Sequence, residues 1–381
     1  ISACLVGSEM CIRDRYEDGL NSVIKTTGAT ASEIAILDDQ FVALSETIPV
    51  AFGTLAELGS TAGQLGVQVP NVRNFVETTA RLAAAVDGIS PQDAAVQLAR
   101  LINVTSTGQD EVDKLAAALV GLGNNFAANE GEILQFSGFL SNLGSTIGLT
   151  APQILGLSTA LVDVGARSQA GGSAVANFFN KSAKALNEGG RQLEQFADIS
   201  GKSTAEFAAD FRGAPLDALQ DFVDGVSNVL GAEGLEGLQA RFNELELVDK
   251  RTTRTFAQLA GGADRLRLAI KLQGEEFVKG TANIDESDRK FEALSGRFKI
   301  FTNRVTNTAR DIGDLLVPAF DRLLKRVDRV IDFFRAGAAV FAKFDKSTQD
   351  LILNVLGLTA ILGPLVIGIS LFLTLLSTAV T

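Results

Sequence analysis

Apolar residues recur three and four positions apart along most of this chain, which is the spacing of one face of an α-helix. Alternating Val, Ile and Thr, the pattern typical of strands, is absent. The spacing therefore predicts an all-α fold, in which a Gly/Ala-rich bundle of short helices leads into a long heptad-patterned helix and an apolar helical segment. The clearest apolar faces before residue 170 are Ala94, Ala95, Leu98 and Ile102; Val112, Leu115, Ala116, Leu119 and Val120; and Ile154, Leu157 and Leu161.

Capping signals predict where several of these helices begin. Ser90 precedes a proline and stands three residues before Asp93, and Thr150 stands three residues before Gln153. Ser203-Thr204-Ala205-Glu206 is a capping box, and a further helix is expected to start at Asp110. Glycines lie where the helices would stop, so the bundle is expected to have Gly-rich turns.

A charged helix with heptad spacing is predicted between about residues 281 and 346. Its apolar positions alternate three and four apart, which is the a/d pattern of a supercoiled helix. The same spacing is also common in a helix that packs within its own domain, and both interpretations stay open. The seam comprises Phe291, Leu294, Phe298, Phe301, Val305, Thr308, Ile312 and Leu315, and after Pro318 it resumes at Phe320, Leu323, Val327, Val330 and Phe334.

Residues 351–381 carry no charged side chain. Their length exceeds the roughly 20 residues that a helix needs to cross a bilayer core. Gly363 and Pro364 interrupt the run, so a buried helical hairpin is the alternative to a membrane segment. The residues expected to face lipid include Leu351, Leu356, Ile361, Leu365, Ile369, Phe372 and Leu376.

Four segments follow from these patterns. Residues 16–260 are expected to form the helical bundle, residues 261–346 long amphipathic, coiled-coil-like helices, and residues 347–381 the apolar segment. Residues 1–15, ISACLVGSEMCIRDR, resemble translated sequencing-adapter read-through and are expected to be an assembly artefact. The chain begins at Ile1 and stops inside an apolar run, so we expect a fragment.

The net charge of −11 is unevenly distributed. Residues 1–240 hold 13 basic and 28 acidic side chains, whereas residues 241–350 hold 21 basic and 17 acidic ones. Because phosphate contacts need clustered Lys and Arg, the acidic part argues against a nucleic-acid surface. The basic residues after 240 are interleaved with acids, as on a solvated helix face.

Candidate chemistry is sparse. The chain has no histidine, which excludes Ser-His, Cys-His and His-metal sites. Gly201-Lys202-Ser203 resembles the end of a phosphate loop, but Phe196 stands where that loop needs glycine, so a helix N-cap is expected instead. The segment 121–126 fails the dinucleotide fingerprint, and Cys4 with Cys11 has neither disulfide nor zinc spacing. We expect no catalytic, cofactor-binding or metal-binding residue, and no enzymatic activity.

Six strings of the chain form an ordered set: GQLGVQVPNVRNFVETTARLAAAVDGISPQDAAVQLARL (63–101), LVGLGNNFAANEGEIL (119–134), TAPQILGLSTALVDVG (150–165), QFADISGKSTAEFAADFR (195–212), IGDLLVPAF (312–320) and ILGPL (361–365). Taken in this order, they resemble the conserved region of phage tail tape measure proteins. The resemblance covers roughly residues 40–368 and lies in the ordered set, since each string alone is weak. Relatives often carry an acidic residue before the Ala170-Gly171 pair, where this chain has Gln169.

The resemblance implies a structural virion protein that lies in the tail lumen in several copies and whose helical length sets tail length. Its implied partners are other copies of itself, the tail tube protein, tail assembly chaperones and, on ejection, the host inner membrane. Genomic DNA would be contacted at most indirectly. The protein would be in the host cytoplasm during assembly and at the host membrane on ejection.

Two other classes of protein are compatible with the same patterns. A membrane-active, pore-forming or toxin-like protein also joins helices to an apolar hairpin, but it would need a receptor or translocation region. A cell-wall hydrolase, which some relatives carry elsewhere in a longer chain, would require sequence beyond Thr381.

Overall fold

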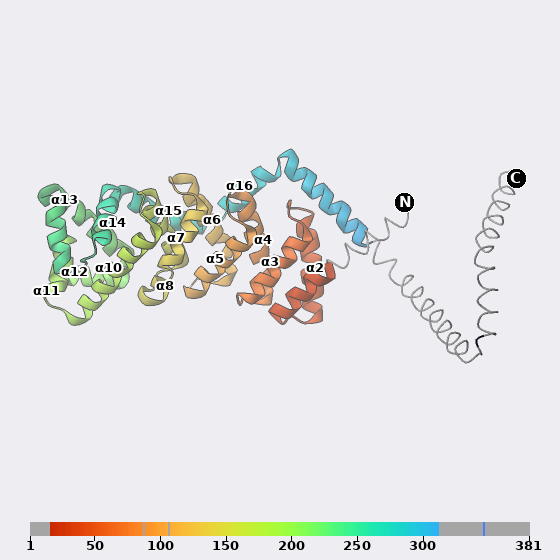
Figure 1. The fold of residues 1–381 in the computed structure, drawn as a ribbon, viewed down its shortest axis with the longest axis horizontal. Helices are drawn as coiled ribbons and strands as arrows, with labels where there is room; N and C mark the ends of the chain where they lie inside the picture. The colour runs from red at the N-terminus through yellow and green to blue at the C-terminus, as the bar shows by residue number, and fades with distance from the viewer. Residues whose placement is uncertain (1–15, 87, 106, 312–345, 347–381) are drawn as a thin grey trace. The chain divides into compact units, whose positions relative to one another are not determined.

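The computed structural model describes residues 16–86, 88–105, 107–311 and 346. Within these ranges every regular element is helical, which confirms the all-α prediction (Figure 1). The helices are residues 16–27, α2 (Ala31–Ser45), α3 (Phe52–Gln64), α4 (Val69–Ala85), α5 (Pro91–Val104), the short 3-10 helix η1 (Gln109–Glu111), α6 (Val112–Asn125), α7 (Glu130–Leu140), α8 (Asn142–Ile147), α9 (Ala151–Asp163), α10 (Ser168–Glu188), α11 (Arg191–Ile199), α12 (Thr204–Gly213), α13 (Pro215–Glu244), α14 (Lys250–Gly261), α15 (Ala263–Lys279), α16 (Ala282–Phe291) and residues 294–311.

The capping signals start helices where the sequence predicts them. The Ser90 hydroxyl accepts the Asp93 N–H at 3.1 Å, and the Thr150 N–H donates to Gln153 Oε1 at 2.9 Å. At α12, the Ser203 N–H donates to Glu206 Oε2 at 2.9 Å. Each bond satisfies a donor that a helix start would otherwise leave unpaired. The helix expected at Asp110 begins instead as η1 and becomes α-helical at Val112.

Two glycines bring α15 close to α6 and α9. A Cβ on Gly121 would lie 2.5 Å from Glu276 Cγ, and a Cβ on Gly156 would lie 2.8 Å from Gln273 Cγ and 3.0 Å from the Ala269 carbonyl oxygen. The absence of a side chain at both positions lets three backbones pack tightly. The segment 121–126, rejected as a dinucleotide motif, thus contributes a packing position.

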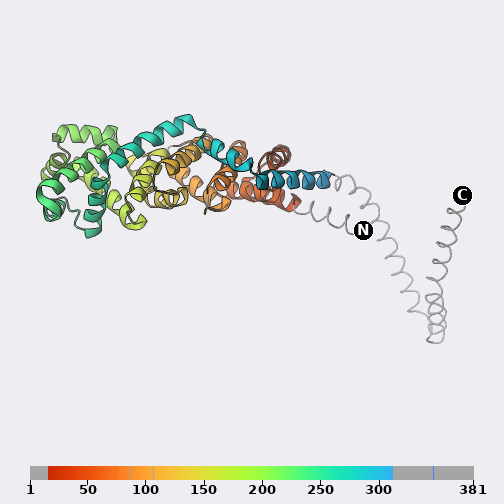
Figure 2. The same cartoon turned by 90° about the horizontal axis from the view of Figure 1, so that it is seen from above.

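Helices α10 to α14 lie at the opposite end of the compact unit from α2 and α3 (Figures 1 and 2). Their core consists largely of phenylalanines. Phe222 on α13 is fully buried, with ring centroids 4.7 Å from Phe178 and 5.4 Å from Phe256. Aromatic pairs at these separations add to the stabilisation from buried area. The cluster, drawn from α10 to α14, comprises Phe178, Phe179, Phe196, Phe207, Phe211, Phe222, Phe242 and Phe256.

The compact unit extends past the boundary that the sequence predicts at residue 260. Helix α15 packs on α6 and α9, and α16 packs on α4 and α6, so the unit continues to Arg310. The long heptad-patterned helix expected from about residue 281 is also interrupted, because α16 ends at Phe291 and the next helix starts at Leu294. Gly296 lies in the first turn of this next helix, where a Cβ would be 2.5 Å from the Phe291 carbonyl oxygen.

None of the described helices is both long enough and apolar enough to span a bilayer. The apolar segment 351–381, and residues 1–15 with their two cysteines, lie outside the described residues.

Candidate functional site: the helix over residues 294–311

This helix carries a polar row and an apolar row on opposite sides. The polar row is Asn303, Asn307 and Arg310, and the apolar row is Leu294, Phe298, Phe301 and Val305. Leu294 and Asn303 are nine residues apart, about 2.5 turns of an α-helix, so their side chains point in opposite directions. Figures 1 and 2 show the helix running beside the N-terminal helices.

The polar row docks onto the end of α2. Asn303 Nδ2 donates to the carbonyl oxygens of Ser45 at 2.8 Å and Val50 at 2.9 Å. The Arg304 guanidinium donates to the Glu46 carbonyl oxygen at 3.0 and 3.2 Å. Ser45 and Glu46 lie at the C-terminus of α2, where carbonyl groups lack partners within the helix. The docking therefore satisfies acceptors that the fold leaves open.

Asn307 and Arg310 extend the same contact. Asn307 is only 3% exposed; its Nδ2 donates to Ser45 Oγ at 3.0 Å, and its Oδ1 accepts the Tyr16 hydroxyl. Arg310 pairs with Asp38, and its guanidinium lies 4.7 Å from the centroid of the Tyr16 ring. Both partners of the ion pair are largely buried, so the row binds in a defined register.

The apolar row is left facing outward. Leu294 is 85% exposed, Phe298 63%, Phe301 60% and Val305 53%. The rings of Phe298 and Phe301 lie 6.5 Å apart and form one patch with their neighbours. A row of large apolar side chains along one exposed helix face is typical of an interaction surface.

The structure separates one predicted seam residue from the others. Phe291 lies on α16, is 7% exposed and packs inside the compact unit, with the Arg81 guanidinium 5.6 Å from its ring centroid. The other seam positions that the structure describes belong to the next helix. Ile312 and Leu315 lie outside the described residues.

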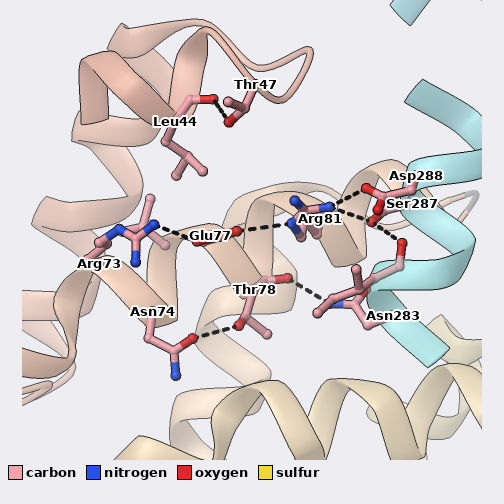
Figure 3. Close-up of polar contacts among 12 residues, drawn as sticks. Leu44, Thr47, Arg73, Asn74, Glu77, Thr78, Arg81, Asn283, Ser287 and Asp288 are labelled. Carbon is pink, nitrogen blue, oxygen red and sulfur yellow. Dashed lines mark hydrogen bonds and ion pairs between the residues drawn. The ribbon is translucent and has the colours of Figure 1, made fainter. Parts of the chain in front are cut away.

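A polar junction between α4 and α16 fixes the point from which this helix departs (Figure 3). Arg81 binds Asp288 at 2.7 Å, Ser287 Oγ at 3.1 Å and Glu77 at 3.2 Å. Asn283 Nδ2 also donates to the Thr78 carbonyl oxygen at 3.3 Å. Because Arg81 bridges the two helices, α16 is held in place immediately before Leu294.

The phosphate-loop resemblance at residues 201–203 has a structural explanation. Ser203 caps α12, and Lys202 pairs with Asp210 and, at 2.5 Å, with Asp221. The hydrogen bonds that Lys202 donates to Asp210 and then to Asp221 raise the pKa of Lys202 above its usual value. The described ranges contain no group of three or more Asp, Glu or Cys side chains placed to hold a metal ion.

Comparison with known proteins identifies the class of protein. The sequence profile of the family described as "Phage-related minor tail protein" matches residues 38–245. This match covers more than half of the chain, so the chain belongs to that family and has a structural role in a phage tail. Searches of curated proteins and of solved structures gave no match.

Proposed function

We propose that this protein is the tape measure of a phage tail: a structural, non-enzymatic protein that sets tail length and scaffolds assembly of the tail tube. The observation that carries the proposal is the outward-facing apolar row on a helix of a minor tail protein, followed in the sequence by heptad spacing that resumes after Pro318 and runs to Phe334. A helix rises about 1.5 Å per residue, so a bundle of such helices measures distance in proportion to chain length.

The partners follow from the same proposal. Other copies of the chain would meet through the apolar row, inside a tube formed by the tail tube protein with the help of tail assembly chaperones. The protein would lie in the lumen of the virion tail, after assembly in the host cytoplasm, and genomic DNA would follow it without a dedicated binding surface.

We further propose that residues 351–381 enter the host inner membrane during genome ejection. Their lack of charge avoids the cost of roughly 2.5–3.5 kcal/mol that each ionic residue incurs at a bilayer centre. A chain with lysine at Ile361 and Ile369 should lose binding to lipid vesicles and keep its helical circular dichroism. Equal vesicle binding by this variant and the parent would refute the membrane role.

The tape-measure role is tested by changing the length of the heptad region. Three extra in-frame copies of Asp321–Phe334 add about 42 residues, so tails should lengthen by about 60 Å in electron micrographs. A matched control carries an insertion of the same length, rich in Gly and Ser, at the turn between Gly189 and Gly190, and should leave tail length unchanged. Tails of parental length from the heptad insertion would overturn the proposal.

A further inference from the structure

Three arginines converge on a cavity between the start of α10 and the first turns of α14. The cavity has a volume of about 360 Å³ and is lined by Arg167, Arg251, Arg254, Gln169, Thr255 and Gln258, among others. Helices α10 and α14 pack directly on each other, and Gln258 Nε2 donates to the Gly165 carbonyl oxygen at 3.4 Å. The two helices therefore bring the three arginines to the lining of one cavity, called here the arginine cavity.

No acidic side chain of the described residues neutralises this cavity. None of the three guanidinium groups lies within 4.0 Å of a carboxylate oxygen in the part of the chain that the structure describes. By contrast, Arg241 binds Glu233 at 2.7 Å and Asp198 at 2.9 Å. In a chain in which acidic residues outnumber basic ones, three arginines without a carboxylate partner in one cavity point to an external anion.

The surrounding backbone increases the positive potential. Arg167 is the N-cap of α10, and Arg251 lies in the first turn of α14, where the helix dipole already places partial positive charge. Asp249, the one carboxylate at the start of α14, accepts the Arg251 N–H at 2.9 Å and does not line the cavity. The positive end of each helix dipole repels basic side chains in these positions. An anion bound in the cavity would be attracted both to the arginines and to the helix N-termini.

We propose that the arginine cavity binds an acidic peptide segment of a protein partner through two neighbouring carboxylates. A guanidinium binds a carboxylate with two parallel hydrogen bonds, and the Gln169 amide lines the same cavity and can bond to a peptide backbone. A long nucleic acid is disfavoured because residues 1–240 are strongly acidic, whereas a short segment with few charges meets little of that repulsion. This binding site is separate from the apolar row and does not depend on the tape-measure role.

The test uses the full chain and fluorescent peptides blocked at both ends, one containing Glu-Glu and the other Gln-Gln at the same positions. Fluorescence anisotropy at low salt should show binding of the Glu-Glu peptide only. Arg254→Gln should weaken binding at least tenfold. Gln169→Glu should do the same, because it supplies an internal carboxylate beside the arginines.

Arg100→Gln is the matched control, since Arg100 is an exposed arginine on α5 with no ion pair among the described residues. It should bind like the parent, and all variants should retain the parental thermal midpoint to within a few degrees. The proposal is overturned if the parent does not bind the Glu-Glu peptide, if the Gln-Gln peptide binds equally, or if Arg100→Gln weakens binding as much as Arg254→Gln. Displacement of the peptide by an equal concentration of inorganic phosphate would also overturn it, in favour of a site for small anions.

Discussion

Replacing Asn303 with alanine should release the helix over residues 294–311 from the end of α2. Its Nδ2 makes two hydrogen bonds to backbone carbonyl oxygens, at 2.8 and 2.9 Å. Each bond contributes about 1 kcal/mol net, so the free energy of local opening should fall by about 2 kcal/mol. Every 1.4 kcal/mol is about a tenfold change, so the open state should become roughly thirty times more populated.

Amide hydrogen exchange followed by mass spectrometry measures this opening directly. Peptides that cover residues 294–311 should exchange roughly thirty times faster in Asn303→Ala, while peptides from α10 to α14 should be unchanged. Thr302→Ala is the matched control, because the Thr302 side chain is exposed and bonds only to the Lys299 carbonyl oxygen of its own helix. Equal exchange rates in the two variants would show that the polar row does not hold the helix.

Three further predictions concern the core and its charges. The hydrogen bonds that Arg265 donates lower the pKa of Asp163 in the folded protein. Their contribution to the free energy of unfolding is therefore complete above the unfolded pKa of about 3.9, and it is lost as pH falls through the lower folded pKa. Asp163→Asn should therefore cost about 2 kcal/mol in urea unfolding at pH 7, and the difference from the parent should shrink as pH falls below the unfolded pKa. Phe222→Ala should cost about 3–5 kcal/mol, whereas Phe298→Ala at an exposed position should cost less than about 0.5 kcal/mol. Gly156→Ala should lower the free energy of unfolding by about 1–3 kcal/mol, because the Ala269 backbone blocks the new methyl group. This cost should exceed the gain from the better helix propensity of alanine. An increase in the thermal midpoint would contradict this packing.

Local signals in the sequence identified most of the helical structure. Capping residues such as Ser90 and Ser203 act within one helical turn, so their effect is visible in a few neighbouring residues. The spacing of the seam also identified the row that the structure leaves exposed. Heptad spacing continues across the break before Leu294, so this spacing alone predicts one continuous helix there. The Ser295-Gly296 pair is a turn signal close to the break.

The docking of the polar row could not be predicted from one sequence. Asn303 and Ser45 are 258 residues apart, and their contact leaves no periodic pattern in either segment. The same holds for the arginine cavity, where Arg167 and Arg254 meet only because α10 packs on α14. Long-range polar contacts depend on how the helices pack, which helical periodicity alone does not determine.

Disulfide cross-linking in assembled particles tests most directly whether copies of the chain meet through the apolar row. In a chain with Cys4 and Cys11 replaced by serine, cysteine is placed either at Phe301, in the apolar row, or at Lys299, an exposed position nearer the polar row. Parallel copies packed through the row bring the side chains at position 301 together and keep those at position 299 apart. Oxidation should therefore give covalent dimers of Phe301→Cys and leave Lys299→Cys monomeric. Equal cross-linking of the two variants, or cross-linking of Lys299→Cys alone, would contradict the account.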